Sequence, residues 1–213
     1  KAGKQPIEPG DVCWADLNND GVINNLDRVK VGNLFPTVTG GFSTTLGYKD
    51  FSLYARFDYA LGHTLYNDLA ARSLGQYQGS FNIIDMVKDS WSETNQNTDI
   101  PKFYYADQLS KKNITRSNNG LTAVDNNSSR FYEKGDYLAL REITLTWNLP
   151  KKWINKALMS NASVYVTGQN LFYITGYTGV SPEPAVDTTY GQGLDNGRYP
   201  TPKTVLLGLS VTF

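Results

Sequence analysis

The sequence predicts an all-β fold with five antiparallel strands, and two observations support this prediction. Five stretches alternate apolar residues with polar or small ones, the period-2 pattern of strands that have one apolar face. The connections between the stretches alternate between short and long, as in outer-membrane barrels with short periplasmic turns and long outer loops. A soluble β-sandwich with irregular insertions is the alternative on these features. Four predicted strands cover residues 39–48, 51–61, about 162–174 and 203–213. The remaining one begins about 75 residues after Leu61 and ends at Leu149, with its alternation clear over 142–149.

The first two predicted strands form a hairpin. Only Lys49 and Asp50 separate them, a length that favours a tight two-residue turn. In the second strand, apolar residues at odd positions alternate with residues that include Arg56 and Asp58. A water-filled lumen accepts such charges opposite the apolar face, whereas a packed sandwich core does not need them.

The remaining strands are separated by one short and two long connections. The third strand ends at Leu149, and residues 150–161 then form a short connection with room for one or two helical turns. The fourth strand is rich in Val, Tyr and Thr, which favour β-structure. The last strand is apolar at every odd position from Val205 to Phe213, and the printed sequence ends on that aromatic residue.

The composition narrows the functional class. With 20 basic and 20 acidic residues the net charge is zero, so we expect no nucleic-acid partner. One Cys and one His exclude an internal disulfide and a Cys- or His-rich metal site. Apolar runs fall far short of the roughly 20 residues of a membrane helix, while a membrane barrel needs no such run. No phosphate loop, nucleophile motif or identifiable pair of carboxylates indicates an enzyme, so we expect none.

An ordered series of motifs runs along the chain. The motifs are DLNNDGVINNLDR (16–28), NTDIPK (97–102), SRFYEKGDYLALREITLTWNLP (129–150), VYVTGQNLF (164–172) and GRYPTPK (197–203). In this order they resemble the C-terminal part of the SusC/RagA-like TonB-dependent outer-membrane transporters. The resemblance covers nearly the whole chain, from about Gly10 to Phe213, and its specificity lies in the order of the motifs.

The resemblance implies a particular protein and setting. The strands would be the last five of a transmembrane barrel of about 22, whose plug and earlier strands lie upstream. Energy would come through TonB, a SusD-like lipoprotein would close the outer side, and an oligosaccharide or oligopeptide would be imported across the bacterial outer membrane. Residues 1–38 would then be an extracellular segment and residues 39–213 the barrel strands, surrounded by outer-membrane lipid, with their loops. The first ten residues contain no apolar core of a signal peptide, so an export signal is expected upstream.

The extracellular segment contains a motif that resembles a calcium loop. Such loops aim oxygens from alternate positions at one hard cation, and a Gly at position 6 permits the sharp turn. Position 12 is Asp instead of the usual Glu, and the alternative is an Asx-rich turn that its own side chains stabilise. The predicted ligands of Ca²⁺ are Asp16, Asn18, Asp20, the carbonyl of Val22, and Asp27.

Four single residues carry further predictions. Trp91, in a predicted outer loop, is the candidate for stacking on substrate; packing against neighbouring loops is the alternative. Phe213 is the candidate assembly signal, since outer-membrane barrels resembling this one end in a strand with a final aromatic residue. His63 is expected to be an ordinary residue at the rim, and Cys13 a buried or partly buried thiol.

A second functional hypothesis belongs to another class. The chain would be a secreted calcium-binding β-sandwich, dockerin-like at its start. The apolar face of the last strand distinguishes the two hypotheses, because a transporter segment exposes it to lipid, whereas a soluble module buries it in its own core.

Overall fold

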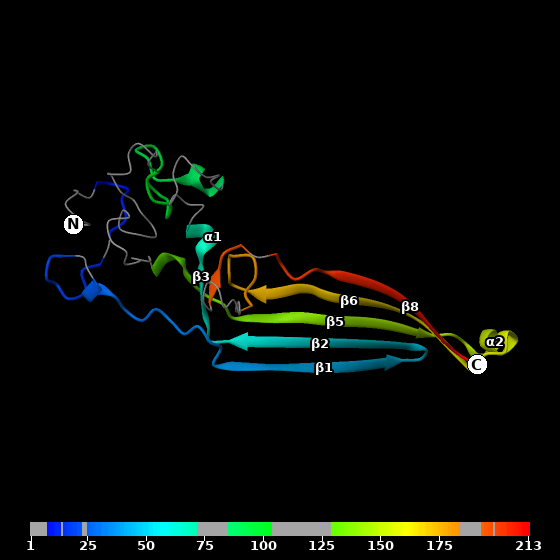
Figure 1. Ribbon diagram of the computed structural model, residues 1–213. Helices are drawn as coiled ribbons and strands as arrows, with labels where there is room; N and C mark the ends of the chain where they lie inside the picture. Colours follow the sequence, from blue (N-terminus) through cyan, green and yellow to red (C-terminus); the bar gives the residue numbers. More distant parts are fainter. Residues whose placement is uncertain are drawn as a thin grey trace. The chain divides into compact units, whose positions relative to one another are not determined.

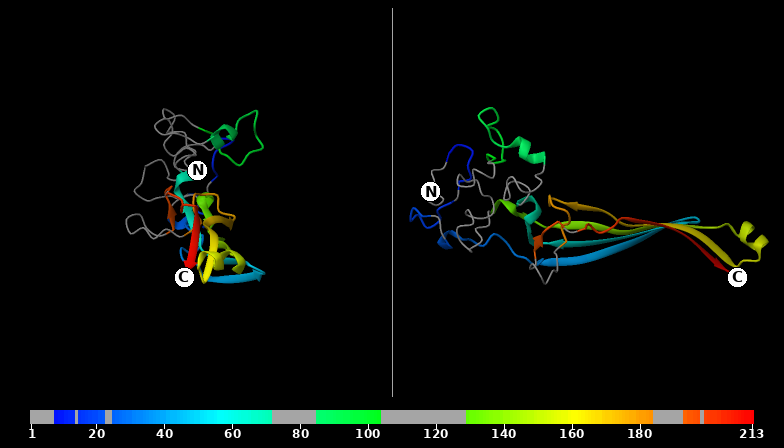
Figure 2. Two further views of the ribbon diagram at one scale, coloured as in Figure 1. Left: turned by 90° about the vertical axis from the view of Figure 1, so that its right-hand side faces the viewer. Right: turned by 45° about the horizontal axis from the view of Figure 1, so that its top comes forward.

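The computed structural model describes residues 8–13, 15–22, 25–71, 85–103, 129–183, 193–197 and 199–213. Its main feature is one antiparallel sheet in which five strands follow each other in sequence order, which confirms the predicted fold class (Figure 1). The views in Figure 2 show that this sheet twists along its length. The strands are β1 (Val38–Tyr48), β2 (Phe51–Leu61), β5 (Tyr137–Asn148), β6 (Asn161–Thr175) and β8 (Thr204–Thr212).

The hairpin between β1 and β2 forms as predicted. Tyr48 pairs with Phe51, so Lys49 and Asp50 are the two turn residues. Lys49 has a φ of 53°. Two-residue turns need such left-handed backbone because it matches the twist of the flanking strands.

The pairing register brings the apolar residues of all five strands onto one face. One row crosses the whole sheet: Leu46 pairs with Leu53, Leu53 with Leu145, Leu145 with Val166, and Val166 with Leu207. Because side chains alternate between faces, the residues before and after each of these point to the opposite face. We call the first face the apolar face and the second the polar face.

A β-bulge interrupts the pairing in the middle of β5. Arg56 pairs with Glu142 and Phe57 with Leu140, so Arg141 has no partner on β2. Leu140 and Ile143 are three residues apart, a spacing that would place them on opposite faces of a regular strand. The extra residue of the bulge keeps both on the apolar face. Bulges of this kind bend a strand and redirect a side chain.

The two edge strands, β1 and β8, are each paired on one side only within the described part of the chain. The five strands do not close on each other. An unpaired edge exposes a row of backbone amides and carbonyls, which makes pairing with further polypeptide favourable.

The short connection between β5 and β6 contains the predicted helical turns. These are α2 (Lys151–Ile154) and the 3-10 turn η6 (Asn155–Ala157). They lie at the end of the sheet where β5 passes into β6 (Figure 1).

Smaller elements form a second group. A three-stranded sheet has the order β4-β3-β7, and its small core contains Tyr66, Ala71 and Phe131. The elements are η1 (Asn25–Asp27), β3 (Thr64–Asn67), α1 (Asp68–Ala71), η3 (Asp85–Asp89), η5 (Ser129–Phe131), β4 (Tyr132–Lys134) and β7 (Leu194–Asp195).

The chain divides into two compact units, both discontinuous in sequence. Unit 1 contains residues 1–32, 65–133 and 186–197, and unit 2 contains residues 33–64, 134–185 and 198–213 with the five-stranded sheet. The predicted division into an extracellular segment, residues 1–38, and barrel strands with their loops, residues 39–213, stays a prediction. Among the described residues, no helix has the length and apolar character needed to cross a membrane.

Candidate functional site

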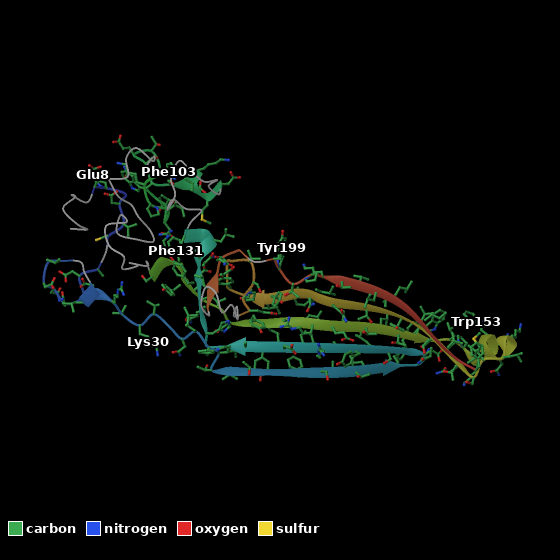
Figure 3. The ribbon with its side chains drawn as sticks, viewed as in Figure 1. Glu8, Lys30, Phe103, Phe131, Trp153 and Tyr199 are labelled. Atoms are coloured by element: carbon green, nitrogen blue, oxygen red, sulfur yellow. The ribbon has the colours of Figure 1, made fainter. Side chains whose placement is uncertain are left out.

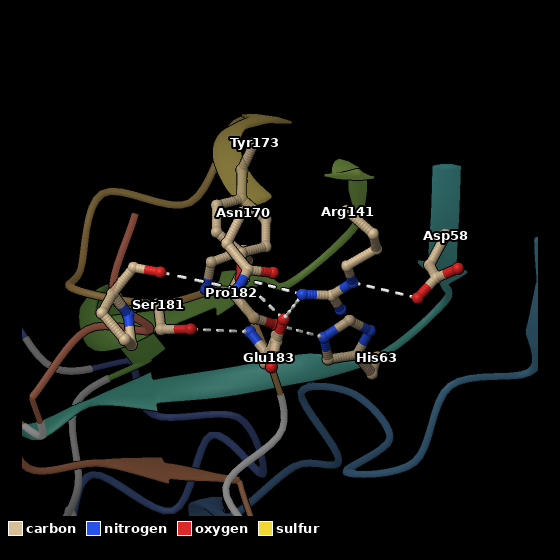
Figure 4. Close-up of polar contacts among 9 residues, drawn as sticks. Asp58, His63, Arg141, Asn170, Tyr173, Ser181, Pro182 and Glu183 are labelled. Carbon is tan, nitrogen blue, oxygen red and sulfur yellow. Dashed lines mark hydrogen bonds and ion pairs between the residues drawn. The ribbon is translucent and has the colours of Figure 1, made fainter. Parts of the chain in front are cut away.

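The candidate site of unit 2 is a polar cluster around Arg141 on the polar face of the sheet (Figure 4). The β5 bulge places Arg141 and Glu142 next to each other between two residues of the apolar face. On the neighbouring strand β6, Asn170 has a φ of 51° and bulges opposite Arg141. Both irregularities therefore serve to present the guanidinium on this face.

Arg141 connects two strands and a loop through its guanidinium. Its Nε donates to Asp58 Oδ2 of β2 at 2.9 Å, and its Nη1 lies 2.6 Å from Glu183 Oε1. Tyr173 of β6 donates its hydroxyl to the same Glu183 oxygen at 2.6 Å and accepts from Arg141 Nη1 at 3.2 Å. The planar guanidinium suits this task because its donors are spread in a rigid fork.

Solvent reaches the carboxylates more than the cation. The Arg141 side chain is 16 % exposed, against 42 % for Asp58 and 32 % for Glu183. Partial burial strengthens the charge-assisted hydrogen bonds, and two carboxylates around one guanidinium leave a net charge of −1. The cluster therefore presents a negatively charged, hydrogen-bonding surface on the polar face.

His63 attaches the same loop from the other side. Its ring is 1 % exposed, so the expectation of an ordinary rim residue was wrong. His63 Nε2 lies 2.9 Å from the carbonyl oxygen of Pro182, which can only accept, so Nε2 carries the proton. A side chain at position 135 would collide with the His63 imidazole, so glycine is the residue that fits there.

Together these contacts hold the start of the loop after β6. Pro182 and Glu183 are bonded to His63, Arg141 and Tyr173, and Tyr137 packs edge-on against both the His63 and the Tyr173 rings. The loop segment is therefore a fixed part of the polar face, since it is bonded at two successive residues.

Unit 1 contains the predicted substrate-stacking residue, Trp91. Its indole is half-buried and packs over Gly10, where a side chain would collide with the ring. Lys102 Nζ lies 6.0 Å from the ring centroid, within the range of a cation–π contact. Trp91 also lines a cavity of about 350 Å³ with Asp99 and Arg130, among others. The contacts of Trp91 with Gly10 and Lys102 are those expected if the ring only packs against neighbouring loops. The cavity beside it leaves room for a ligand group.

The predicted calcium residues form a hydrogen-bonded loop in unit 1. Asp16 accepts from the amides of Asp20 at 3.2 Å and Gly21 at 2.8 Å. Asp20 Oδ1 accepts from the amide of Val22 at 2.8 Å. Asn18 Oδ1 also accepts from the amide of Asp20, and Asp27 Oδ1 accepts from the amide of Leu17, both bonds within the same segment. Bonds of this kind, from Asp and Asn side chains to nearby backbone amides, are those of the Asx-rich turn that was the alternative to a calcium loop.

The described residues, which include Asp16, Asp20 and Asp27, contain no group of three or more His, Cys, Asp or Glu side chains that could hold a metal ion as they stand. Cys13 is exposed, so the prediction of a buried or partly buried thiol was wrong. Phe213 follows β8 and is 88 % exposed.

The Arg141 cluster was missed in the sequence, although one signal for it was present. Arg141 and Glu142 are adjacent charges between two apolar residues, which breaks the alternation of β5. Two consecutive polar residues in an alternating strand indicate a bulge. The partners Asp58 and Glu183 could not be recognised, because they lie far away in the sequence.

Comparisons with known proteins agree with this architecture. The chain is 32 % identical over 212 residues to TonB-dependent receptor P3 of Formosa agariphila, a match that covers 97 % of this chain and 19 % of that protein. It is 26 % identical over 211 residues to TonB-dependent receptor SusC of Bacteroides thetaiotaomicron, covering 98 % of this chain and 18 % of the relative. No family model matches the sequence.

Solved structures give the same result. The structure of the RagAB peptide transporter matches 84 % of this chain and 17 % of its own, with a TM-score of 0.64 and 25 % identity. The RagAB peptide importer in the closed-closed state matches with a TM-score of 0.62, again at 25 % identity, over 84 % of this chain and 18 % of that one.

The chain is therefore homologous to TonB-dependent receptors. Within that class its relatives are the SusC/RagA-like proteins that the motifs indicated. The chain spans about a fifth of the length of the curated relatives that it matches. Receptors and importers are not enzymes, which is consistent with the expectation of no enzymatic activity.

Proposed function

We propose that this chain forms part of the wall and outer loops of a TonB-dependent transporter in the bacterial outer membrane. The transporter would import an oligosaccharide or an oligopeptide together with a SusD-like surface lipoprotein. The names of the relatives, which are TonB-dependent receptors and a peptide importer, support this proposal. The open edges of the sheet would pair with the rest of the same transporter.

The observation that carries the proposal is the contrast between the two faces of the sheet. On β8, the apolar-face residues Val205, Leu207 and Leu209 are 71 %, 81 % and 65 % exposed. The other face carries the Arg141 cluster and a hydrogen bond of 2.8 Å between the Thr144 and Thr167 hydroxyls. A strand that exposes apolar side chains on one side and polar ones on the other suits lipid outside and water inside.

The secreted β-sandwich has no comparable support. A sandwich needs a second layer over the apolar face, since its core lies between two sheets. In the described residues this face of β8 is exposed, and the relatives named above are TonB-dependent receptors.

Substrate contact is proposed for two places. The polar face would line the lumen, where the net negative charge around Arg141 favours neutral or cationic groups such as sugar hydroxyls or peptide amines over anions. Trp91 would stack its ring on a substrate at the cavity in unit 1.

The test is uptake by cells that depend on the full transporter and its lipoprotein partner. We expect deletion of the gene to abolish uptake of one labelled substrate class, either oligosaccharides or oligopeptides, and removal of TonB to have the same effect. The native protein should need detergent for extraction. Uptake that does not depend on TonB, or a protein that is soluble without detergent, would refute the proposal.

We also propose that the Asp16–Asp27 segment binds Ca²⁺. The side-chain oxygens of Asp16 and Asp20 both turn toward the backbone of this segment. Carboxylates accept more than one contact each, so these bonds do not use up their capacity for a hard cation. Titration with Tb³⁺, read by its luminescence, would detect the site, and excess Ca²⁺ should displace the signal. A receptor with no saturable signal, or one whose signal survives D16A/D20A, would exclude calcium here.

A further inference from the structure

One end of the five-stranded sheet carries a firmly held platform. In the β5–β6 connection, the Trp153 amide donates to the Pro150 carbonyl at 2.8 Å and the Leu149 amide to the Ala162 carbonyl at 2.9 Å. The Ser160 amide donates to the Thr212 carbonyl of β8 at 2.7 Å. The connection is therefore bonded within itself and to two strands, so it presents its exposed side chains in a defined geometry.

The platform continues the apolar face of the sheet. Ile154 is buried, whereas Trp153 is 56 % exposed and Leu158 is 87 % exposed. The Trp153 ring packs edge-on against Trp147, with centroids 5.9 Å apart, and Trp147 in turn stacks on Phe51. Both Trp147 and Phe51 belong to the apolar face through their register. Figure 3 shows Trp153 on α2 at this end of the sheet.

The charges of the platform are almost all positive. The two turns at this end, residues 49–50 and 149–161, contain four Lys and one Asp. Lys151 Nζ donates to the Ser160 carbonyl at 3.2 Å. Lys152 and Lys156 are exposed, and neither has an ion pair with any residue that the structure describes. Lys152 belongs to α2 and Lys156 to the 3-10 turn that follows it, so both lie in the connection between β5 and β6.

We propose that this platform docks onto the headgroups of anionic phospholipids. Trp153 and Leu158 enter the boundary between acyl chains and headgroups, a position that indole rings favour. Lys152 and Lys156, with Lys49 of the neighbouring turn, contact lipid phosphates. Such a combination of exposed aromatic and basic residues beside an apolar surface fits a membrane surface, whereas a nucleic acid or an acidic protein would leave the apolar part unpaired.

The proposal rests on the proposed function, because it needs the apolar face to lie in a bilayer. It adds the chemical class of lipid and the residues that select it. Each Lys near an anionic surface changes the lipid affinity by about fivefold. Removing two of them should therefore lower the preference for anionic lipid by about 25-fold, and adding two negative charges should lower it further.

The test uses the full receptor in nanodiscs of phosphatidylethanolamine mixed with phosphatidylglycerol. The measured quantity is the enrichment of phosphatidylglycerol in the lipid that remains bound after detergent exchange. We expect enrichment in the parent, its loss in K152E/K156E, and full retention in K30E/K203E, which changes two other exposed lysines by the same charge. Trp153→Ala should weaken retention of both lipids equally, because it removes apolar contact and no charge.

The outcomes separate this proposal from the proposed function. A receptor that inserts into the nanodiscs and shows no enrichment overturns the lipid proposal alone. Equal losses in both double variants overturn it too, since they indicate an effect of overall charge. A receptor that does not insert at all overturns the membrane function and the lipid proposal together.

Discussion

The two faces of the five-stranded sheet differ in where their side chains find favourable contacts. On the apolar face, residues such as Leu46, Leu145 and Leu207 stand side by side across the strands and remain exposed. On the polar face, Arg141 is largely buried because the strands and a loop supply its hydrogen-bond partners. The apolar face thus depends on its surroundings for favourable contacts, whereas the polar face makes many of its contacts within the chain.

The largest expected effect comes from placing a charge on the apolar face. Leu207→Arg should destabilise the receptor in lipid by about 2–4 kcal/mol, the cost of a cation near the middle of the hydrocarbon. Leu206→Arg is the matched control, because its side chain is at nearly the same depth on the polar face. Guanidinium unfolding of the receptor in vesicles measures both. Equal destabilisation by the two variants would contradict the assignment of the faces.

A second effect is expected at the end of the apolar face. If Phe213 is an assembly signal, Phe213→Ala should lower the amount of folded receptor at the cell surface several-fold. The receptor that does form should melt close to the parent, because the lost ring contributes only about 2 kcal/mol.

Surface labelling and thermal melting of the purified protein measure these two quantities. Thr212→Ala, at the neighbouring position on the polar face, is the control and should leave the surface amount unchanged. If the Phe213→Ala receptor reaches the cell surface in the same amount as the parent, Phe213 is an ordinary interfacial residue and not an assembly signal.

A smaller effect is expected from removing the contacts of Arg141 on the polar face. Arg141→Met removes the contacts to Asp58, Tyr173 and Glu183 and leaves two carboxylates without their cation. Because these groups are partly exposed, we expect a loss of about 1–2 kcal/mol. The loop around Glu183 should exchange its amide hydrogens faster, while the apolar face keeps its protection.

Two further variants make this prediction specific. Arg141→Lys retains the charge without the guanidinium fork, so it should restore only part of the protection. Lys88→Met breaks an exposed pair with Asp85 of 2.8 Å and should change little. Unchanged exchange around Glu183 in Arg141→Met would show that the cluster does not hold the loop.

The smallest effect is expected away from both faces. D16A/D20A removes the side chains that bond the backbone of the 16–27 segment, so proteolysis of this segment should become faster. Assembly of the sheet should be unchanged, because the strands make no use of these bonds. If calcium binds here, its removal from the parent should have the same effect. Slow proteolysis in the variant would show that other contacts order the segment.

Local patterns were sufficient to predict the strands and their faces. Alternation located β2 at residues 51–61, as observed, and the two-residue turn at Lys49 and Asp50. The tight turn and the alternation both depend on neighbouring residues, so they can be recognised within a few positions. In β5 the alternation could be followed only from Glu142 onward, because the bulge at Arg141 shifts it by one residue before that point.

Burial of single side chains was less predictable. His63 was expected at a rim and is buried, and Cys13 was expected to be at least partly buried and is exposed. The bond from His63 reaches Pro182, which is 119 residues away in the sequence. No local pattern carries information about such a partner.

The sequence by itself determined a sheet with one apolar and one polar face, since side-chain direction alternates with every residue and requires no knowledge of the partner strand. Its ordered motifs also determined the class of relatives. Only the tertiary structure decided that Arg141 joins Asp58 of β2 to Glu183 of the loop after β6. The physical reason is that a charged hydrogen bond depends on distances of about 3 Å between groups that only the folded register brings together.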